Sequence, residues 1–177
     1  MRSGQTLVKV ARGAALGALL TVMSSTAALA QAATKEQAAL ATALRAKHVA
    51  LATALDAAAA KGKPISAKYE YEDGKLQLSV YTEKGGQFSE VIVDHHSGKV
   101  AKTEKITEGD DLKSAQAQSA ATAKAKSSLA AALGKALAAN KGYSAVSATA
   151  TLNGAQPVAE ITLMKGAEFK TVSEPLS

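Results

Sequence analysis

The stretch from Ile65 to Val80 reads ISAKYEYEDGKLQLSV, and it decides the fold of this chain. Apolar and polar side chains alternate on both sides of Asp73-Gly74, and a period of two is typical of half-buried β-strands. An Asp-Gly pair favours a two-residue type I′ turn. The turn and the alternation independently predict one antiparallel register, with Ile65 on the apolar face. It pairs Glu72 with Lys75, Tyr71 with Leu76, Tyr69 with Leu78 and Ala67 with Val80.

A helix and two further strands are predicted around this hairpin. Thr34 and Gln37 have the spacing of a capping box, so we expect a helix to begin there and to end before Gly62. Four leucines share one side of this helix: Leu40, Leu44, Leu51 and Leu55. After the hairpin we expect a turn at Gly85-Gly86, a strand over 87–93, a turn from Asp94 to Gly98 and a strand over 99–103.

The same order of elements recurs in the second half of the chain. An alanine-rich helix is predicted over about 113–140, before Gly142, and Asn153-Gly154 predicts a second hairpin turn. With Asn153-Gly154 as the turn, the predicted pairs are Leu152 with Ala155, Ala148 with Ala159 and Val146 with Ile161. The matching turn glycines lie 80 or 81 positions apart, which one single-residue insertion would explain.

We therefore predict an α+β protein made of two repeats, each a helix packed on a small antiparallel sheet. The first unit spans 34–106, a linker spans 107–112, and the second unit spans 113–177 and lacks the final turn and strand of the first. Alanine contributes 41 of the 177 residues, so the larger apolar side chains suit two thin cores better than one wide core.

The N-terminus has the pattern of a secretory signal peptide over residues 1–30. Arg2, Lys9 and Arg12 precede an apolar run from Gly13 to Met23 that is too short to span a bilayer. Small residues then predict cleavage after Ala30, or alternatively after Ala32. We expect a periplasmic or secreted protein without a membrane span in its mature form. Cleavage would lower the formal net charge from +6 to +3.

Composition excludes several classes of function. The chain has no cysteine, so it has neither disulfides nor thiolate chemistry. Beyond the predicted signal peptide Arg45 is the only arginine, whereas proteins that read nucleic acids favour arginine. We therefore expect no nucleic-acid partner. No pattern of catalytic or cofactor-binding residues stands out, and we expect neither an enzyme nor a cofactor.

The residues of the first unit resemble the PepSY domain. The resemblance rests on Ile65-Ser66-Ala67, Asp73-Gly74-Lys75, the segment QFSEVIVD over 87–94, and Ser97-Gly98-Lys99-Val100. The second unit resembles the family more loosely, with Glu174-Pro175 in place of the turn aspartate. The resemblance implies a helix on a small antiparallel sheet, in a bacterial envelope or secreted protein that regulates or inhibits peptidases.

The segment Asp94-His95-His96 carries two alternative interpretations. Asp94 is suited to accept hydrogen bonds from the amides of its own turn, with Gly98 supplying a positive φ. Alternatively, Asp94, His95 and His96 could ligate a metal if a tight turn made them converge. Our first hypothesis is a non-enzymatic module that binds another protein, such as a peptidase, through a sheet edge or loops. The alternative is an envelope protein that binds a metal or a small ligand at this turn.

Overall fold

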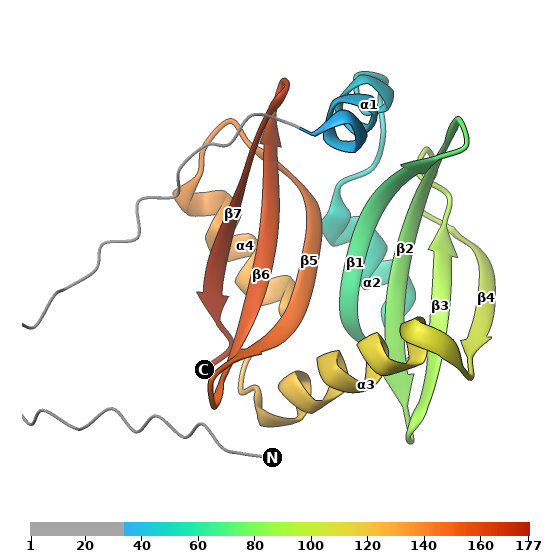
Figure 1. Ribbon diagram of the computed structural model, residues 1–177, viewed down its shortest axis with the longest axis vertical. Helices are drawn as coiled ribbons and strands as arrows, with labels where there is room; N and C mark the ends of the chain where they lie inside the picture. Colours follow the sequence, from blue (N-terminus) through green and yellow to red (C-terminus); the bar gives the residue numbers. More distant parts are fainter. Residues whose placement is uncertain (1–33) are drawn as a thin grey trace, which may run out of the picture.

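Seven antiparallel strands form one continuous sheet in the computed structural model, which describes residues 34–177 (Figure 1). The strands follow the spatial order β4-β3-β2-β1-β5-β6-β7, so β1 and β5 meet at the centre and β4 and β7 form the edges. The α+β class is thus confirmed, and the two predicted sheets are joined into one. The strands are β1 Lys63–Glu72, β2 Lys75–Lys84, β3 Gln87–Val93, β4 Val100–Ile106, β5 Ser144–Asn153, β6 Gln156–Lys165 and β7 Glu168–Pro175. The predicted signal peptide and its cleavage sites lie outside the described residues.

Four helices cover the sheet unequally. Helices α2 (Leu51–Ala59) and α4 (Leu129–Ala139) pack on one face, whereas α3 (Gly109–Lys124) crosses the opposite face at one end of the strands (Figure 1). Helix α1 (Lys35–Ala43) lies at the other end of β1. None of the helices in residues 34–177 has the length and the apolar content needed to cross a membrane.

Each long helix predicted from the sequence is in fact two helices. The first breaks over residues 44–50 because its backbone is recruited by distant groups: the Val49 N–H donates to His95 O (2.8 Å), and the Val49 carbonyl accepts from the Tyr69 hydroxyl (2.7 Å). Burial raises the pKa of Tyr69 to about 12, so the hydroxyl keeps the proton that it donates. All four leucines still pack in the core or against it: Leu40, Leu44, Leu51 and Leu55.

The second predicted helix, 113–140, breaks over 125–128 for a similar reason. The amides of Lys126 and Ser127 donate to the Leu176 carbonyl, and Ser128 then caps α4 by accepting from the Ala131 N–H. Helix α3 also begins earlier than predicted, at Gly109, so most of the predicted linker 107–112 is helical. Gly62 does not end α2. The C-cap residue of this helix is Ala60, and its backbone has the right-handed helical conformation.

The first hairpin has the predicted register, whereas the predicted register of the second is wrong by two residues. Glu72 pairs with Lys75 as expected, and the intervening Asp73 and Gly74 have φ of 49° and 77°, as in a type I′ turn. In the second hairpin Asn153 pairs with Gln156, so the turn is Gly154-Ala155 rather than Asn153-Gly154. Only Gly154 has a positive φ there (59°), which matches a type II′ turn. The observed pairs include Leu152 with Pro157, Ala150 with Ala159 and Ala148 with Ile161.

The two halves of the sheet are related by a local two-fold axis. Strands β1, β2 and β3 begin 81 positions before β5, β6 and β7, so the predicted insertion between the hairpins is unnecessary. Both central strands carry a register shift at equivalent positions, between Pro64 and Ser66 and between Ala145 and Ser147. The equivalent residues Ala67 and Ala148 pair with each other where β1 meets β5. The axis therefore passes through this alanine pair.

One main core contains residues from both halves of the chain. It includes Leu55 and Leu78 from the first half, and Leu133 and Ile161 from the second, all at most 2% exposed. A smaller cluster on the opposite face joins Ile65 and Tyr81 to Ala115 of α3. Ile65 was expected to share a face with Ala67. The bulge at Ile65 overrides the simple alternation and turns this side chain towards α3.

Candidate functional site

The turn after β3 is built by Asp94. One carboxylate oxygen, Asp94 Oδ1, accepts from the backbone N–H groups of Ser97 (2.6 Å) and His96 (3.3 Å), and the Gly98 N–H closes the turn on the Asp94 carbonyl (2.8 Å). Hydrogen bonds from the Ser97 side chain and backbone lower the pKa of Asp94. The carboxylate therefore points at the amides of its own turn.

We expect Asp94→Ala to lower the free energy of unfolding at neutral pH. The pKa of Asp94 is lower in the folded state than in the unfolded state. The stabilisation that the carboxylate contributes is therefore fully present above its unfolded-state pKa of about 3.9, and it is lost as the pH falls through its folded-state pKa. Urea unfolding at pH 7 and near pH 2.5 measures this: the variant should be less stable only at pH 7. Glu72→Ala, at an exposed carboxylate at the end of β1, is the control. Equal stability of Asp94→Ala and the parent at pH 7 would contradict the assigned hydrogen bonds.

The two turn histidines dock the turn against the loop between α1 and α2. Besides the bond from Val49 to the His95 carbonyl, His96 Nδ1 lies 3.3 Å from the Lys47 carbonyl. The rings of His95 and His96 are 4.1 Å apart, and burial lowers the pKa of His95, with the neighbouring His96 adding to the effect. His48 lies in this loop, and its ring makes an edge-to-face contact with the ring of Tyr69 (5.3 Å between centroids).

A metal centre at Asp94, His95 and His96 gains no support from this arrangement. Within residues 34–177 no group of three or more histidine, aspartate and glutamate side chains is placed to hold a metal ion. The carboxylate of Asp94 serves its own turn, and the imidazole of His96 faces a backbone carbonyl. The turn connects β3 to β4 and holds them against the loop before α2.

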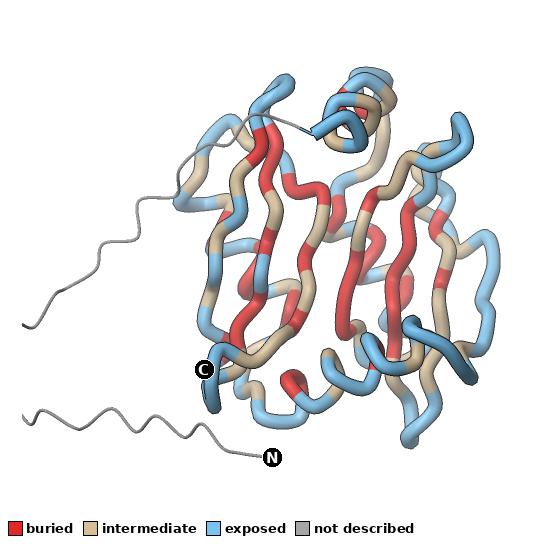
Figure 2. Tube along the Cα trace, in the orientation of Figure 1, coloured by how far each residue is buried: buried red, intermediate tan, exposed pale blue. Residues whose placement is uncertain are grey.

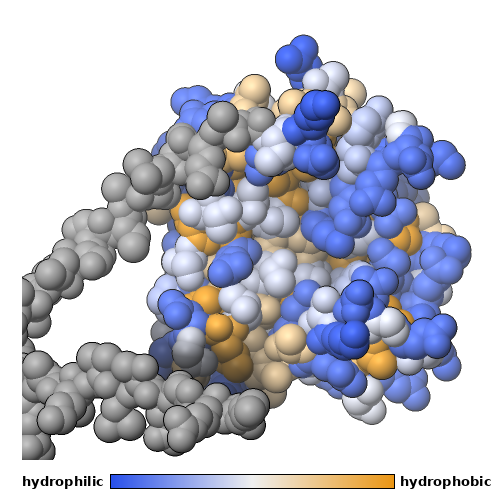
Figure 3. Space-filling model, in the orientation of Figure 1, coloured by the Kyte–Doolittle hydropathy of each residue, from blue (hydrophilic) through white to orange (hydrophobic). Residues whose placement is uncertain are grey.

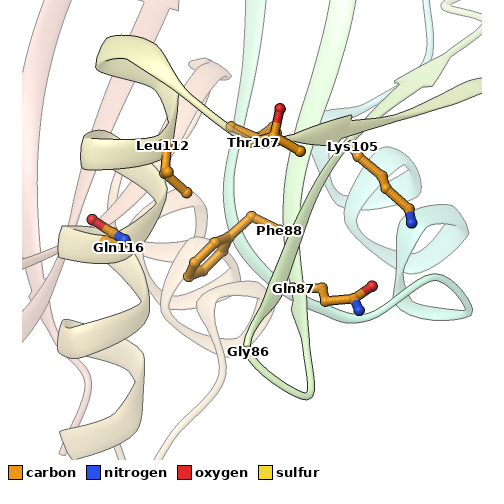
Figure 4. Close-up of a pocket in the computed structure, with 8 residues that line it drawn as sticks. Gly86, Gln87, Phe88, Lys105, Thr107, Leu112 and Gln116 are labelled. Atoms are coloured by element: carbon orange, nitrogen blue, oxygen red, sulfur yellow. The ribbon is translucent and has the colours of Figure 1, made fainter.

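An apolar groove that the sequence did not predict lies between α3 and the ends of β3 and β4. It has a volume of about 430 Å³. The Phe88 ring points towards α3, and Leu112 extends towards the ring, while Gln87 and Lys105 point away (Figure 4). Ile106 pairs with Phe88 across the two strands and adds to the apolar wall. Sequence alone gave no signal for the groove, because nothing placed α3 on this face of the sheet.

Strand β4 forms an open edge beside this groove. All five residues from Ala101 to Lys105 are exposed (Figure 2). Lys84 and Gln87 flank the two-residue turn at Gly85-Gly86 and form a hydrogen-bonded pair, so the odd-numbered residues of β3 form their backbone hydrogen bonds with β2. The even-numbered residues of β3 form theirs with β4. The N–H and C=O groups of Thr103 and Lys105 therefore point outward, whereas Ala101 lies at a register shift between β3 and β4. In the described part of the chain no strand pairs with these groups.

The half of the sheet around β4 carries a hydrophilic surface on the face that α3 crosses (Figure 3). Two ion pairs of 2.7 Å lie within single strands, Lys68 with Glu70 and Lys102 with Glu104. The Ser79 hydroxyl donates to Glu90 (2.7 Å). Strand β4 thus presents unpaired backbone between charged side chains, and the apolar groove lies at its end.

Comparison with known proteins gives no assignment. The chain matches no protein-family model, no curated protein and no solved structure.

Proposed function

We propose that this chain is an exported PepSY-type module that binds an extended segment of another protein and performs no covalent chemistry itself. The partner class that we propose is an exported peptidase, in the periplasm or outside the cell. This proposal rests on the residue pattern around Asp73-Gly74 and Asp94 to Gly98. The turn geometry supports it, because Asp94 and Gly98 act together to direct the chain from β3 into β4.

The relation between the two halves supports a duplication of such a unit. Strands β1 to β3 and β5 to β7 have the same spacing, and their central strands share the same bulge position. Only the first half adds a fourth strand, β4, in residues 34–177. We therefore assign the binding role to the first half.

The observation that carries the binding proposal is the open β4 edge running into the groove. An extended peptide can add to an exposed edge through main-chain hydrogen bonds, while pockets select its side chains. The outward groups of Thr103 and Lys105 would supply these bonds. Phe88, Ile106 and Leu112 would accept an apolar side chain of the added strand near the end of β4.

Photo-crosslinking tests which edge binds. A photoreactive amino acid at Thr103 should crosslink the mature chain to an exported protein, whereas the same residue at Thr171, in the middle of the opposite edge strand, should not crosslink to it. Mass spectrometry would identify the product. A panel of purified thermolysin-like metallopeptidases would show directly whether the mature chain changes their activity.

Two variants sharpen this experiment. Thr103→Pro removes an outward N–H without removing a bond to β3, so it should weaken the crosslink while the chain stays folded. Leu112→Gln should also weaken it by making the groove polar. An absence of crosslinked protein from Thr103, or equal products from Thr103 and Thr171, would contradict binding at the β4 edge.

A further inference from the structure

At the opposite edge of the sheet, no strand within residues 34–177 pairs with the outer side of β7. Leu176 donates its N–H to the Pro157 carbonyl (2.9 Å). This bond shows which alternate residues of β7 form backbone hydrogen bonds with β6. The even-numbered residues of β7 therefore bond to β6. The N–H and C=O groups of Phe169, Thr171 and Ser173 point outward, and Pro175 has only a carbonyl to offer there.

We propose that β7 pairs with β7 of a second copy of this chain, antiparallel, with Val172 on the two-fold axis. The outward backbone groups belong to odd-numbered residues in both copies, so the axis must pass through a residue and not between two residues. With Val172 on the axis, Thr171 exchanges hydrogen bonds with Ser173 of the other copy. Phe169 can donate to the Pro175 carbonyl, and the ladder ends there because proline returns no bond.

Charge favours this register over those with the axis through Thr171 or Lys170. With Val172 on the axis, Lys170 of each copy lies opposite Glu174 of the other, on the same face of the sheet. An axis through Thr171 would instead place Glu168 opposite Glu174, and an axis through Lys170 would place two lysines opposite each other. Opposite charges across a strand pair stabilise it and like charges destabilise it.

These two charged groups are available for such pairing. Among residues 34–177, neither Lys170 nor Glu174 takes part in an ion pair, whereas Lys102 on the β4 edge is already paired with Glu104. In the single copy the Lys170 ammonium lies 4.0 Å from the centre of the Tyr143 ring, a cation–π contact.

The molecule already contains a junction of this design. Strands β1 and β5 join the two halves antiparallel, and a local two-fold axis passes through the paired Ala67 and Ala148. The proposed dimer repeats this arrangement with Val172 at the axis, and it would extend the sheet across both copies. Because the contact is isologous, it closes at two copies and does not continue into a fibre.

Sedimentation velocity of the mature chain over a range of concentrations tests the dimer. We expect a monomer–dimer equilibrium that Lys170→Glu or Glu174→Lys alone weakens by about tenfold, because the symmetry repeats each charge contact twice. The double variant, with both charges exchanged, should restore the dimer. A chain that stays monomeric up to about millimolar concentration would overturn the proposal, because a dimer that needs still higher concentrations would be weak even for protein association.

Proline scanning of the two edges provides the matched control. Thr171→Pro removes an outward N–H of β7 and should abolish the dimer, whereas Thr103→Pro at the equivalent place on β4 should leave it unchanged. Circular dichroism would check that both variants fold, and the charge exchange tests the proposal independently if one does not. A dimer that survives Thr171→Pro and the single charge reversals would use another surface and would refute pairing through β7. The proposed β4 binding site is tested by separate variants.

Discussion

Leu133→Ala should lower the free energy of unfolding by about 2–5 kcal/mol, and the chain should still unfold in a single transition. Leu133 is 1% exposed at the centre of α4. Its removal leaves a cavity under a helix that packs on β5, β6 and β7. Leu55 of α2 is 2% exposed in the corresponding layer of the first half, so Leu55→Ala should have an effect of the same size.

The single transition is the more informative part of this expectation. Two independent units would melt separately, and Leu133→Ala would then shift only the transition of the second half. The main core instead contains Leu55 and Leu133 together, and the sheet is continuous through Ala67 and Ala148. Loss of packing in either half should therefore destabilise the whole sheet.

Differential scanning calorimetry and urea unfolding of the chain without residues 1–30, the predicted signal peptide, measure both quantities. The calorimetric and van't Hoff enthalpies should agree for the parent and for both leucine variants. Lys135→Ala, at an exposed position of the same helix, should change the stability by less than about 0.5 kcal/mol. Two resolved transitions, with only one of them moved by Leu133→Ala, would show that the halves unfold independently.

The hairpins show how far local sequence signals reach. The first was predicted pair by pair, because Asp73-Gly74 and the alternating side chains require the same register. In the second, Asn153-Gly154 looked like the same turn, but Gly154 occupies the first central position of a type II′ turn. A shift of two residues keeps each side chain on its face, so alternation could not reveal the error.

The helices and the junction between the halves depend on contacts that are distant in sequence. The break after α1 follows from bonds between Val49 and both Tyr69 and His95, and no residue near Val49 signals it. Helix α3 buries only Ala115, Ala121 and Thr122, so its sequence carries no stripe of large apolar residues. The strands β1 and β5 meet at two alanines, which are common throughout this chain.

The same limitation explains the sequence-based view of the candidate site. The turn role of Asp94 was predictable because its hydrogen bonds lie within four residues. The groove was not predictable, because Leu112 reaches Phe88 only after α3 has folded back across the sheet. The identity of the edge strands requires the strand order, which local periodicity does not contain.

Gly62→Ala should destabilise the protein by about 1–3 kcal/mol, although glycine-to-alanine changes often stabilise. A Cβ atom at Gly62 would lie 2.8 Å from the Glu83 carbonyl oxygen and 3.1 Å from its carbonyl carbon. Both atoms belong to the backbone of β2, which is held between β1 and β3 and cannot shift without disturbing their pairing. The reduced entropy of the unfolded chain returns only about 0.4–1 kcal/mol. The close contact should therefore dominate.

Gly134→Ala makes the same chemical change at a position where no neighbouring atom would clash with the added Cβ. Gly134 lies within α4, and a Cβ atom there would meet no other heavy atom within 4 Å. Alanine is the better helix former by about 1 kcal/mol, so Gly134→Ala should stabilise the chain. Urea unfolding of the two variants should thus give changes of opposite sign. Stabilisation by Gly62→Ala would contradict the close approach of Gly62 to β2. Destabilisation by Gly62→Ala would show that Gly62 is required for backbone packing and not for ending a helix.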